Sequence, residues 1–326
     1  LKGRSSVRME DLQRLPKVEA KRQVTTGGHF AYMKIAEGCD KHCTYCIIPK
    51  IRGRFRSRPM EELIREAEEL AEQGVKELIL VAQETTLYGK DLYGEKSLPV
   101  LLRKLCKISG LRWIRVLYCY PEEITDELIR VMKEEPKICH YLDLPIQHAN
   151  DDILKRMGRK TSKQELIDIV GKLRKEIPDI CLRTTLITGF PGETQEQYEE
   201  LYRFVSEMEF DRLGVFTYSP EEDTPAALMP DQIEESVKEE RQAELMELQQ
   251  EIAFEAAENM VGKEVLVMIE GKVADENVYV GRTYKDAPNI DGLIFVETGV
   301  ELVSGDFAKV RVTGALEYDL IGGIEE

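Results

Sequence analysis

Long apolar runs and an excess of positive charge are both missing from this chain of 326 residues. No apolar run approaches the ~20 residues that a helix needs to cross a bilayer, which excludes an integral helical membrane protein. The N-terminal residues LKGRSSVRMED carry charges but no apolar core, so they do not form a secretory signal peptide. An initiator methionine is also missing, and we therefore expect a fragment of a longer protein.

The charge balance limits the partners that the chain can attract. It has 45 basic and 61 acidic residues, a net charge of −16. A protein whose main ligand is a phosphate backbone usually presents a basic face, and only the stretch from Lys50 to Arg58 is basic here. An acidic surface attracts basic proteins, although charge alone also fits a surface that serves only solubility.

Seven cysteines without a regular framework argue against a secreted disulfide scaffold and favour the cytoplasm. Cys39, Cys43 and Cys46 lie in the string CDKHCTYC, and no fourth cysteine is nearby. A closed iron–sulfur or structural zinc site takes four protein ligands. Three thiolates on one short loop therefore suggest a 4Fe–4S cluster with one iron open to a further ligand.

Other interpretations of this loop remain open from spacing alone. A histidine could complete a zinc site, but His42 is adjacent to Cys43, and His29 lies ten residues before Cys39. The fourth cysteine of a bacterial ferredoxin motif is absent. Three buried structural cysteines are the remaining alternative, which the charged neighbours make a poor fit.

The loop also resembles a known family. CDKHCTYC fits the C-x3-C-x-aromatic-C signature of the radical S-adenosylmethionine superfamily, with Tyr45 as the aromatic residue. The longer string YMKIAEGCDKHCTYCIIPKIRGRFRSRP is similar to that of the methylthiotransferases, and the resemblance covers roughly residues 24–326. It implies that Cys39, Cys43 and Cys46 bind the cluster, that S-adenosylmethionine binds the open iron, and that a 5′-deoxyadenosyl radical forms. It also implies that Tyr45 lies near the adenine; a packing role is the alternative.

Strand-like and helix-like runs alternate from Phe30 to Ser219, which predicts an α/β fold. The expected strands are FAYMKIA, ELILVA, WIRVLYCY, HYLDLPIQ, CLRTTLIT and LGVFTYS. Capping-box patterns at Ser162 and Thr194 mark two helix starts. Six βα units in series imply a parallel sheet curled into a partial (βα)6 TIM-like barrel, with functional loops at the carboxyl ends of the strands.

The pattern of expected helices and strands changes after Pro230. We expect a connecting amphipathic helix with an acidic outer face in residues 230–260 and a small all-β barrel in residues 261–326. The second segment resembles the TRAM domain of methylthiotransferases, while residues 24–229 form the radical domain and residues 1–23 a linker remnant. The TRAM-like segment has 13 acidic and six basic residues, which favours a basic protein partner over RNA.

Further cofactor contacts are expected at the ends of later strands. Candidates for binding S-adenosylmethionine are Gln83, Glu84, Gln147, Arg183 and Gly189, with Asp143 and His148 nearby in the sequence. Arg183 could hold a carboxylate in a bidentate contact, or pair with an acid on a neighbouring strand. Ordinary structural hydrogen bonds are the alternative for Gln83 and His148. Glycine at 189 allows a tight turn and a close approach.

The other cysteines, at 106, 119, 139 and 181, are scattered, and we expect them in the core. The resemblance implies a second 4Fe–4S cluster, held by three cysteines in a domain that precedes the radical domain. The residues before the first expected strand contain no cysteine. We therefore expect this chain to lack that domain and to cleave S-adenosylmethionine without completing sulfur insertion.

The strings RVLYCYPEEIT and YLDLPIQHAN resemble the methylthiotransferases that modify the β-carbon of an aspartate in protein twelve of the small ribosomal subunit. A basic ribosomal protein also suits an acidic enzyme. An electron donor is a further expected partner, and no membrane is. Methylthiolation of a tRNA adenosine, using Lys50 to Arg58 against phosphates, is the alternative within enzymes. A non-catalytic iron–sulfur electron carrier is the alternative outside them.

Overall fold

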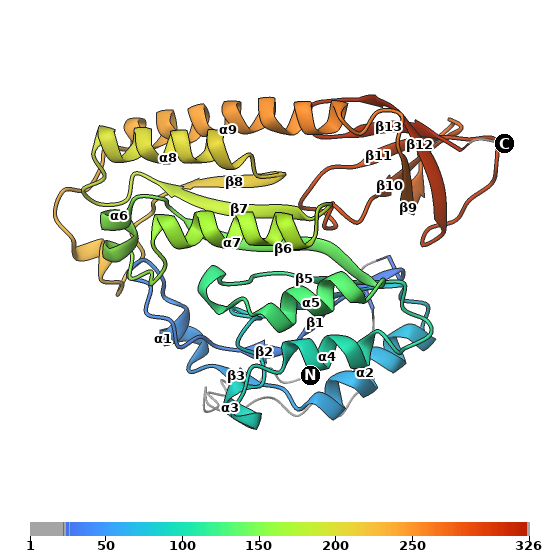
Figure 1. Cartoon of the computed structure of the whole chain (residues 1–326), viewed down its shortest axis with the longest axis horizontal. Coiled ribbons are helices and arrows are strands. Elements are labelled where there is room, and N and C mark those ends of the chain that lie inside the picture. The colour runs from blue at the N-terminus through green and yellow to red at the C-terminus, as the bar shows by residue number, and fades with distance from the viewer. Residues whose placement is uncertain (1–21, 23, 26, 325–326) are drawn as a thin grey trace, which may run out of the picture.

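The computed structural model describes residues 22, 24–25 and 27–324, and it confirms the expected α/β fold class. Six parallel strands form one curled sheet in the order β1-β4-β5-β6-β7-β8 (Figure 1). The expected linker remnant, residues 1–23, lies outside the described residues except for Arg22. No helix in the described part of the chain is long and apolar enough to span a membrane.

The strands of this sheet match the six runs expected from the sequence. They are β1 (Phe30–Lys34), β4 (Glu77–Val81), β5 (Trp113–Val116), β6 (Ile138–Gln147), β7 (Cys181–Thr188) and β8 (Arg212–Thr217). Each pairs in parallel with its neighbour, so all six carboxyl ends lie at one edge of the sheet. Side chains from both faces are buried in β4, β5 and β6, whereas buried and partly exposed residues alternate along β7 and β8.

Helices cover the convex face of the sheet, and short elements fill the connections. The longer helices are α2 (Met60–Glu72), α4 (Leu98–Leu105), α5 (Asp126–Glu134), α7 (Lys163–Glu176) and α8 (Gln195–Met208). The short ones are α1 (Ile48–Arg52), α3 (Lys90–Tyr93), α6 (Asp151–Arg156), η1 (Pro121–Glu123) and η2 (Ala226–Leu228), with a two-stranded pair β2 (Ala36–Glu37) and β3 (Arg56–Ser57). Both expected capping boxes form, at Ser162 with Glu165 and at Thr194 with Gln197.

The connecting helix α9 (Glu235–Glu258) differs from the apolar stripe expected for it. Lys238, Arg241 and Gln249 are buried on its inner face beside Leu245. Their side chains donate to the carbonyl of Tyr218, the carboxylate of Glu193 and the carbonyl of Phe210, at 2.9, 2.7 and 2.9 Å. The helix covers β8 and the loops at the strand ends, whose polar groups need donors, and so its inner face is polar in part.

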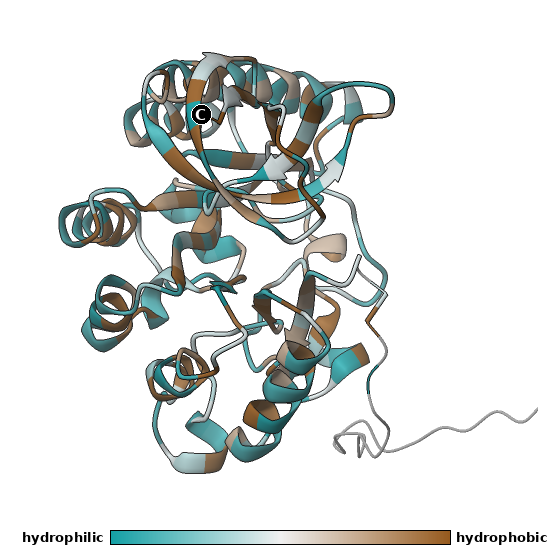
Figure 2. Cartoon of the chain, turned by 90° about the vertical axis from the view of Figure 1, so that its right-hand side faces the viewer, coloured by the Kyte–Doolittle hydropathy of each residue, from teal (hydrophilic) through white to brown (hydrophobic). Residues whose placement is uncertain are grey.

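The C-terminal strands close into a small barrel beside the sheet, at the end opposite α1 and α6 (Figure 1). They are β9 (Glu264–Lys272), β10 (Val278–Arg282), β11 (Ile294–Glu297), β12 (Phe307–Ala315) and β13 (Leu320–Gly323), in the order β10-β11-β13-β12-β9. Figure 2 looks onto this barrel and shows apolar and polar residues alternating along its strands. The sequence pattern contained no sign of β13, because two of its four residues are glycine.

The small barrel closes one end of the curled sheet through a buried charge network. Arg282 of β10 donates to one carboxylate oxygen of Glu77 at 2.7 Å, and Arg115 of β5 donates to the other at 2.8 Å. All three side chains are fully buried. Beside them the ring of Trp113 meets that of Phe307 edge to face, with 4.9 Å between centroids. The two parts of the chain thus share one core.

Candidate active site

The three expected cluster thiols lie on the loop that follows β1, at the edge where the strands end. The side chains of Cys39 and Cys43 are buried, and that of Cys46 is half-buried. The backbone N–H of Lys41 donates to Cys39 Sγ at 3.4 Å. Burial raises the pKa of the Cys39 thiol to about 11, so metal binding there must displace a proton.

Gly38 and Gln83 hold the start of this loop in place. Gly38 has a φ of +79°, and a Cβ at this position would lie 2.2 Å from the carbonyl oxygen of Arg54. Its N–H donates to the side-chain oxygen of Gln83 at 2.8 Å. The chain therefore needs glycine here, and Gln83 ties the loop to the end of β4. The predicted contact of Gln83 with a cofactor stays a prediction.

The turn after α6 supports the loop from the other side. Thr44 donates through its backbone N–H to the carbonyl of Met157 at 2.9 Å, and through its hydroxyl to that of Arg156 at 2.8 Å. A Cβ at Gly158, which has a φ of +72°, would lie 2.7 Å from the carbonyl oxygen of His42. This close approach carries the next residue, Arg159, to the cysteine loop.

Tyr120 and Arg159 lie next to Cys43, and the sequence analysis identified neither as a site residue. The Tyr120 hydroxyl lies 3.7 Å from Cys43 Sγ, and the guanidinium of Arg159 lies 4.3 Å from the centre of the Tyr120 ring. Tyr120 follows β5 at the same edge as the cysteines, a position that could have marked it. Arg159 lies in an irregular turn with no motif, so the sequence offers no signal for it.

Glu84 lies at the end of β4 and is fully buried. One carboxylate oxygen accepts from the backbone N–H of Thr86 at 2.9 Å and from its hydroxyl. The other oxygen has no partner among the described residues. Burial raises the pKa of Glu84 to about 7, against the opposing effects of Thr86 and Lys41. The position is consistent with the expected site, and the contact with a cofactor stays a prediction.

A cavity of about 500 Å³ opens inside the curled sheet. It is lined by Val81, Ala82, Leu117, Tyr118, Asp143, Pro145, Arg183, Thr185, Phe216 and Ile290. Ile290 comes from the small barrel and the others from the sheet and its loops. Apolar side chains therefore surround a few polar groups, which suits a site for a small cofactor and part of a substrate.

Arg183 is the cation of this cavity, and it is already paired. Its Nη1 lies 2.8 Å from a carboxylate oxygen of Asp143 on the neighbouring strand, and its Nε lies 3.5 Å from Asp291 of the small barrel. This arrangement matches the alternative in which Arg183 pairs with a neighbouring acid. Contact with a cofactor carboxylate would require Arg183 to share its donors.

The ends of β6 and β7 meet around a buried carboxylate. Gln147, which is buried, has a φ of +73°, a strained value for a residue that is not glycine. His148 Nδ1 accepts from the backbone N–H of Asn150 at 2.9 Å, and its Nε2 lies 3.5 Å from Glu193. Glu193 accepts from the N–H of Gly189 at 3.1 Å and from Arg241. A Cβ at Gly189 would collide with the side chain of Lys238, so no ligand is needed to explain the glycine. His148 and Gly189 thus have structural partners, while Gln147 remains a candidate.

Tyr45 and the remaining cysteines have packing roles in this structure. Tyr45 packs against an apolar group that includes Phe190 and Tyr218, and its side chain also interacts with Cys43. Its position near an adenine stays a prediction. The cysteines expected in the core are buried, at positions 106, 119, 139 and 181. Burial raises the pKa of each of these thiols, as expected for unreactive cysteines.

The donor set on the loop fits an iron–sulfur cluster. Among the described residues, no three His, Cys, Asp or Glu side chains converge as the ligands of one metal ion do. A cubane cluster makes no such demand, because each thiolate binds a different iron atom. Two nitrogen atoms of the buried Arg159 guanidinium, Nε and Nη1, have no hydrogen-bond partner in the same part of the chain, and they complement a negatively charged group. Cys39, Cys43 and Cys46 would hold the cluster.

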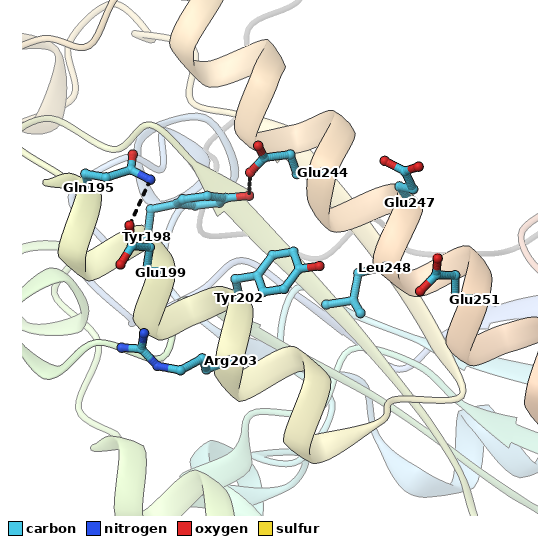
Figure 3. Close-up of a pocket in the computed structure, with 9 residues that line it drawn as sticks. All are labelled: Gln195, Tyr198, Glu199, Tyr202, Arg203, Glu244, Glu247, Leu248 and Glu251. Atoms are coloured by element: carbon cyan, nitrogen blue, oxygen red, sulfur yellow. Dashed lines mark hydrogen bonds between the residues drawn. The ribbon is translucent and has the colours of Figure 1, made fainter.

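A second hollow of about 500 Å³ lies away from the strand ends, between α8 and α9 (Figure 3). It is lined by Gln195, Tyr198, Glu199, Tyr202, Arg203, Glu244, Glu247, Leu248 and Glu251. Tyr198 donates to Glu244 at 2.6 Å, and the amide of Gln195 donates to Glu199 at 3.3 Å. None of the predicted site residues lines this groove, so the chemistry is expected at the strand ends instead.

Comparison with known proteins finds two domain families in this chain. The radical SAM superfamily profile matches residues 33–205, and the TRAM domain profile matches residues 261–324. The ribosomal protein uS12 methylthiotransferase RimO of Lachnoclostridium phytofermentans is 66% identical over 325 residues, which are 100% of this chain and 74% of that protein. The RimO of Clostridium perfringens is 56% identical over 304 residues, 93% of this chain and 68% of its own length.

Solved structures share the fold at low sequence identity. Coproporphyrinogen III oxidase (HemN) from Escherichia coli, a radical SAM enzyme, superimposes with a TM-score of 0.53 at 18% identity. The match covers 87% of this chain and 67% of HemN. The superfamily implies a 4Fe–4S cluster and S-adenosylmethionine as cofactors. The chain belongs to the radical SAM superfamily and, within it, to the family of ribosomal protein uS12 methylthiotransferases.

Proposed function

We propose that this chain carries the radical chemistry that adds a methylthio group to the β-carbon of an aspartate in ribosomal protein uS12. The observation that carries the proposal is the three-thiol loop at the strand ends, within a chain that is 66% identical to a uS12 methylthiotransferase. A ribosomal substrate also implies a cytoplasmic location, which fits seven cysteines that are all free thiols.

In this proposal, different residues bind the cluster, support the loop and contact S-adenosylmethionine. Cys39, Cys43 and Cys46 hold the cluster, while Gln83 fixes the loop that carries them. When bound, the cluster and S-adenosylmethionine supply the radical that removes hydrogen from an unactivated carbon. The cavity beside Arg183 would hold and orient the bound groups. The proposed contacts of S-adenosylmethionine are Tyr45, Gln83, Glu84, Gln147, Arg183 and Gly189.

Charge supports a basic protein as the substrate. The chain carries a net charge of −16, and four of the five basic side chains between Lys50 and Arg58 lie 2.6 to 3.8 Å from its own acids. Arg54 lies 3.4 Å from Asp40, and Arg58 lies 2.6 Å from Glu66. Such guanidinium groups are less available for phosphates, which disfavours the alternative of tRNA as the substrate.

The whole reaction needs parts beyond the residues described above. We propose an electron donor as a partner, and a second 4Fe–4S cluster outside residues 24–326, as the resemblance implies. Anaerobic reconstitution of this chain should then give about four irons per chain, the content of one 4Fe–4S cluster. A content of about eight would contradict the proposal of a single cluster in this chain.

Two measurements test the function. Reduced, reconstituted protein should release 5′-deoxyadenosine from S-adenosylmethionine, and the Cys43→Ala variant should not. Persistent absence of that product from cluster-loaded protein would favour an electron carrier.

Separately, binding to uS12 should be tight and should weaken as salt rises, with no comparable binding to tRNA. Preferential binding to tRNA would contradict the choice of substrate.

A further inference from the structure

Arg159 is a buried cation with unused hydrogen-bond donors beside the cysteine loop. Only 8% of the residue is exposed, and its Nη2 donates to the carbonyl of Pro145 at 2.9 Å. Its Nε and Nη1 are buried, and neither has a hydrogen-bond partner in the described part of the chain. A guanidinium stays charged in a protein, and the nearby carboxylate of Glu122 provides a counter-charge but no hydrogen bond to these donors. These N–H donors are therefore suited to bind an anionic group.

Asp40 and Cys43 are the groups on this loop that can provide negative charge, and Asp40 already accepts from the backbone N–H of Phe55 at 3.1 Å and from Arg54 at 3.4 Å. Arg159, Tyr120, Cys43 and Glu122 line one small cavity of about 80 Å³. The carboxylate of Glu122 already accepts from Thr161 at 2.9 Å and from Lys41 at 3.1 Å. Cys43 Sγ lies 3.7 Å from the Tyr120 hydroxyl and also interacts with the side chain of Tyr45, and it becomes a thiolate when it binds a metal.

Tyr120 links the cation to the sulfur. The Arg159 guanidinium lies over the Tyr120 ring, 4.3 Å from its centre, and Lys41 Nζ lies 4.8 Å from the same centre. Positive charge over the ring makes the hydroxyl a better donor. The Lys41 ammonium is paired with Glu122 and Glu123, whereas the charge of Arg159 acts on Cys43 as well as on Glu122.

We propose that Arg159 and Tyr120 together stabilise the reduced form of a cluster bound through Cys43. The Tyr120 hydroxyl donates a hydrogen bond to the Cys43 sulfur, and Arg159 adds a buried positive charge. Hydrogen bonds to the ligand sulfurs and nearby positive charge both raise the reduction potential of a cluster. The proposal rests on the proposed function, because it takes the cluster to be held by this loop. Arg159 is a positioning residue, since it acts through Cys43 and not on the substrate.

The test is a redox titration followed by electron paramagnetic resonance, on the whole chain reconstituted without S-adenosylmethionine. Arg159→Gln should lower the midpoint potential by about 59 mV, which for one electron is a tenfold loss of stabilisation of the reduced state. Tyr120→Phe should shift it in the same direction by less, and Arg159→Lys should keep most of the unmodified value. Lys155→Gln is the control, because this exposed charge on the neighbouring helix is screened by water.

The outcomes separate this inference from the proposed function. If the unmodified chain binds no cluster, both fail. If it binds a cluster and Arg159→Gln leaves the potential unchanged at full iron content, only the inference fails. A loss of affinity for S-adenosylmethionine without a change in potential would also overturn it, because the Arg159 donors would then serve the cofactor carboxylate. If Arg159→Gln cannot hold iron, the midpoint potentials of the other two variants decide. Tyr120→Phe should still lower the potential, and Arg159→Lys should keep most of the unmodified value.

Discussion

Replacing Glu77 with glutamine should weaken the contact between the sheet and the small barrel. The Glu77 carboxylate is fully buried and accepts from Arg115 at 2.8 Å and from Arg282 at 2.7 Å. The substitution keeps the shape of the side chain, but it leaves two buried guanidinium groups without this shared counter-charge. Breaking a buried ion pair in this way costs ~3–5 kcal/mol of the free energy of unfolding.

The single tryptophan provides the assay. Trp113 is buried, and its ring meets that of Phe307 of the small barrel at 4.9 Å, so its fluorescence reports on this interface. Urea titrations at pH 7 should show a lower midpoint for Glu77→Gln than for the unmodified chain. Glu264→Gln is the matched control. It breaks an exposed pair with Lys309 in the same barrel and should cost less than ~1 kcal/mol.

The pH dependence gives the same prediction a second check. Burial alone would raise the pKa of Glu77, but the guanidinium groups of Arg115 and Arg282 outweigh it and lower the pKa. A carboxylate with a lowered pKa stabilises the fold above its ordinary value near 4.5, and this contribution is lost as the pH falls through the lowered value. The two proteins should therefore differ most at neutral pH. A loss for Glu77→Gln no larger than that for Glu264→Gln would refute the reasoning.

Three further substitutions test local features of the fold and the site. Gly38→Ala should abolish iron binding, because its Cβ would meet a backbone carbonyl at 2.2 Å, whereas Gly171→Ala on open helix surface should retain it. Burial raises the pKa of Glu84 to about 7, so the stability of the cofactor-free protein should fall as the pH rises from 4.5 to 7. In denaturation experiments, the stability of the Glu84→Gln variant should not fall over this pH range. Ser162→Ala removes a capping box and should cost about 1 kcal/mol in urea denaturation, whereas the exposed Ser206→Ala should cost almost nothing.

Local patterns predicted most of the fold, because each strand of the parallel sheet is a short run of β-branched and aromatic residues between marked helix starts. The inner face of α9 could not be predicted in this way. Apolar spacing pointed to an ordinary amphipathic helix, but Lys238, Arg241 and Gln249 are buried there against acceptors that lie 20 to 48 residues earlier in the chain. A pattern within the helix contains no information about those acceptors.

The site also contains features that local sequence predicts and features that it does not. The cysteine spacing and the position after a strand predicted where the loop lies, because both are local in sequence. The supports of the loop are distant: Tyr120 lies 77 residues from Cys43, and Gln83 lies 45 residues from Gly38. The sequence could nominate Gln83 only by its place after a strand. The sequence could not nominate Arg159. This residue stands out because its Nε and Nη1 are buried without hydrogen-bond partners among the described residues, and only the structure shows this.

The small barrel is better described as part of the catalytic unit than as a separate module. Its Arg282 completes the buried network of the sheet, its Ile290 lines the central cavity, and its Asp291 accepts from Tyr141 at 2.7 Å and contacts Arg183. Deleting the barrel would uncover Trp113 and remove a counter-charge from Glu77, so the loss of activity would say nothing about substrate recognition. Substitutions of exposed acids on the barrel, such as Glu301→Gln, are the proper test, because they change its surface charge and leave the shared core intact.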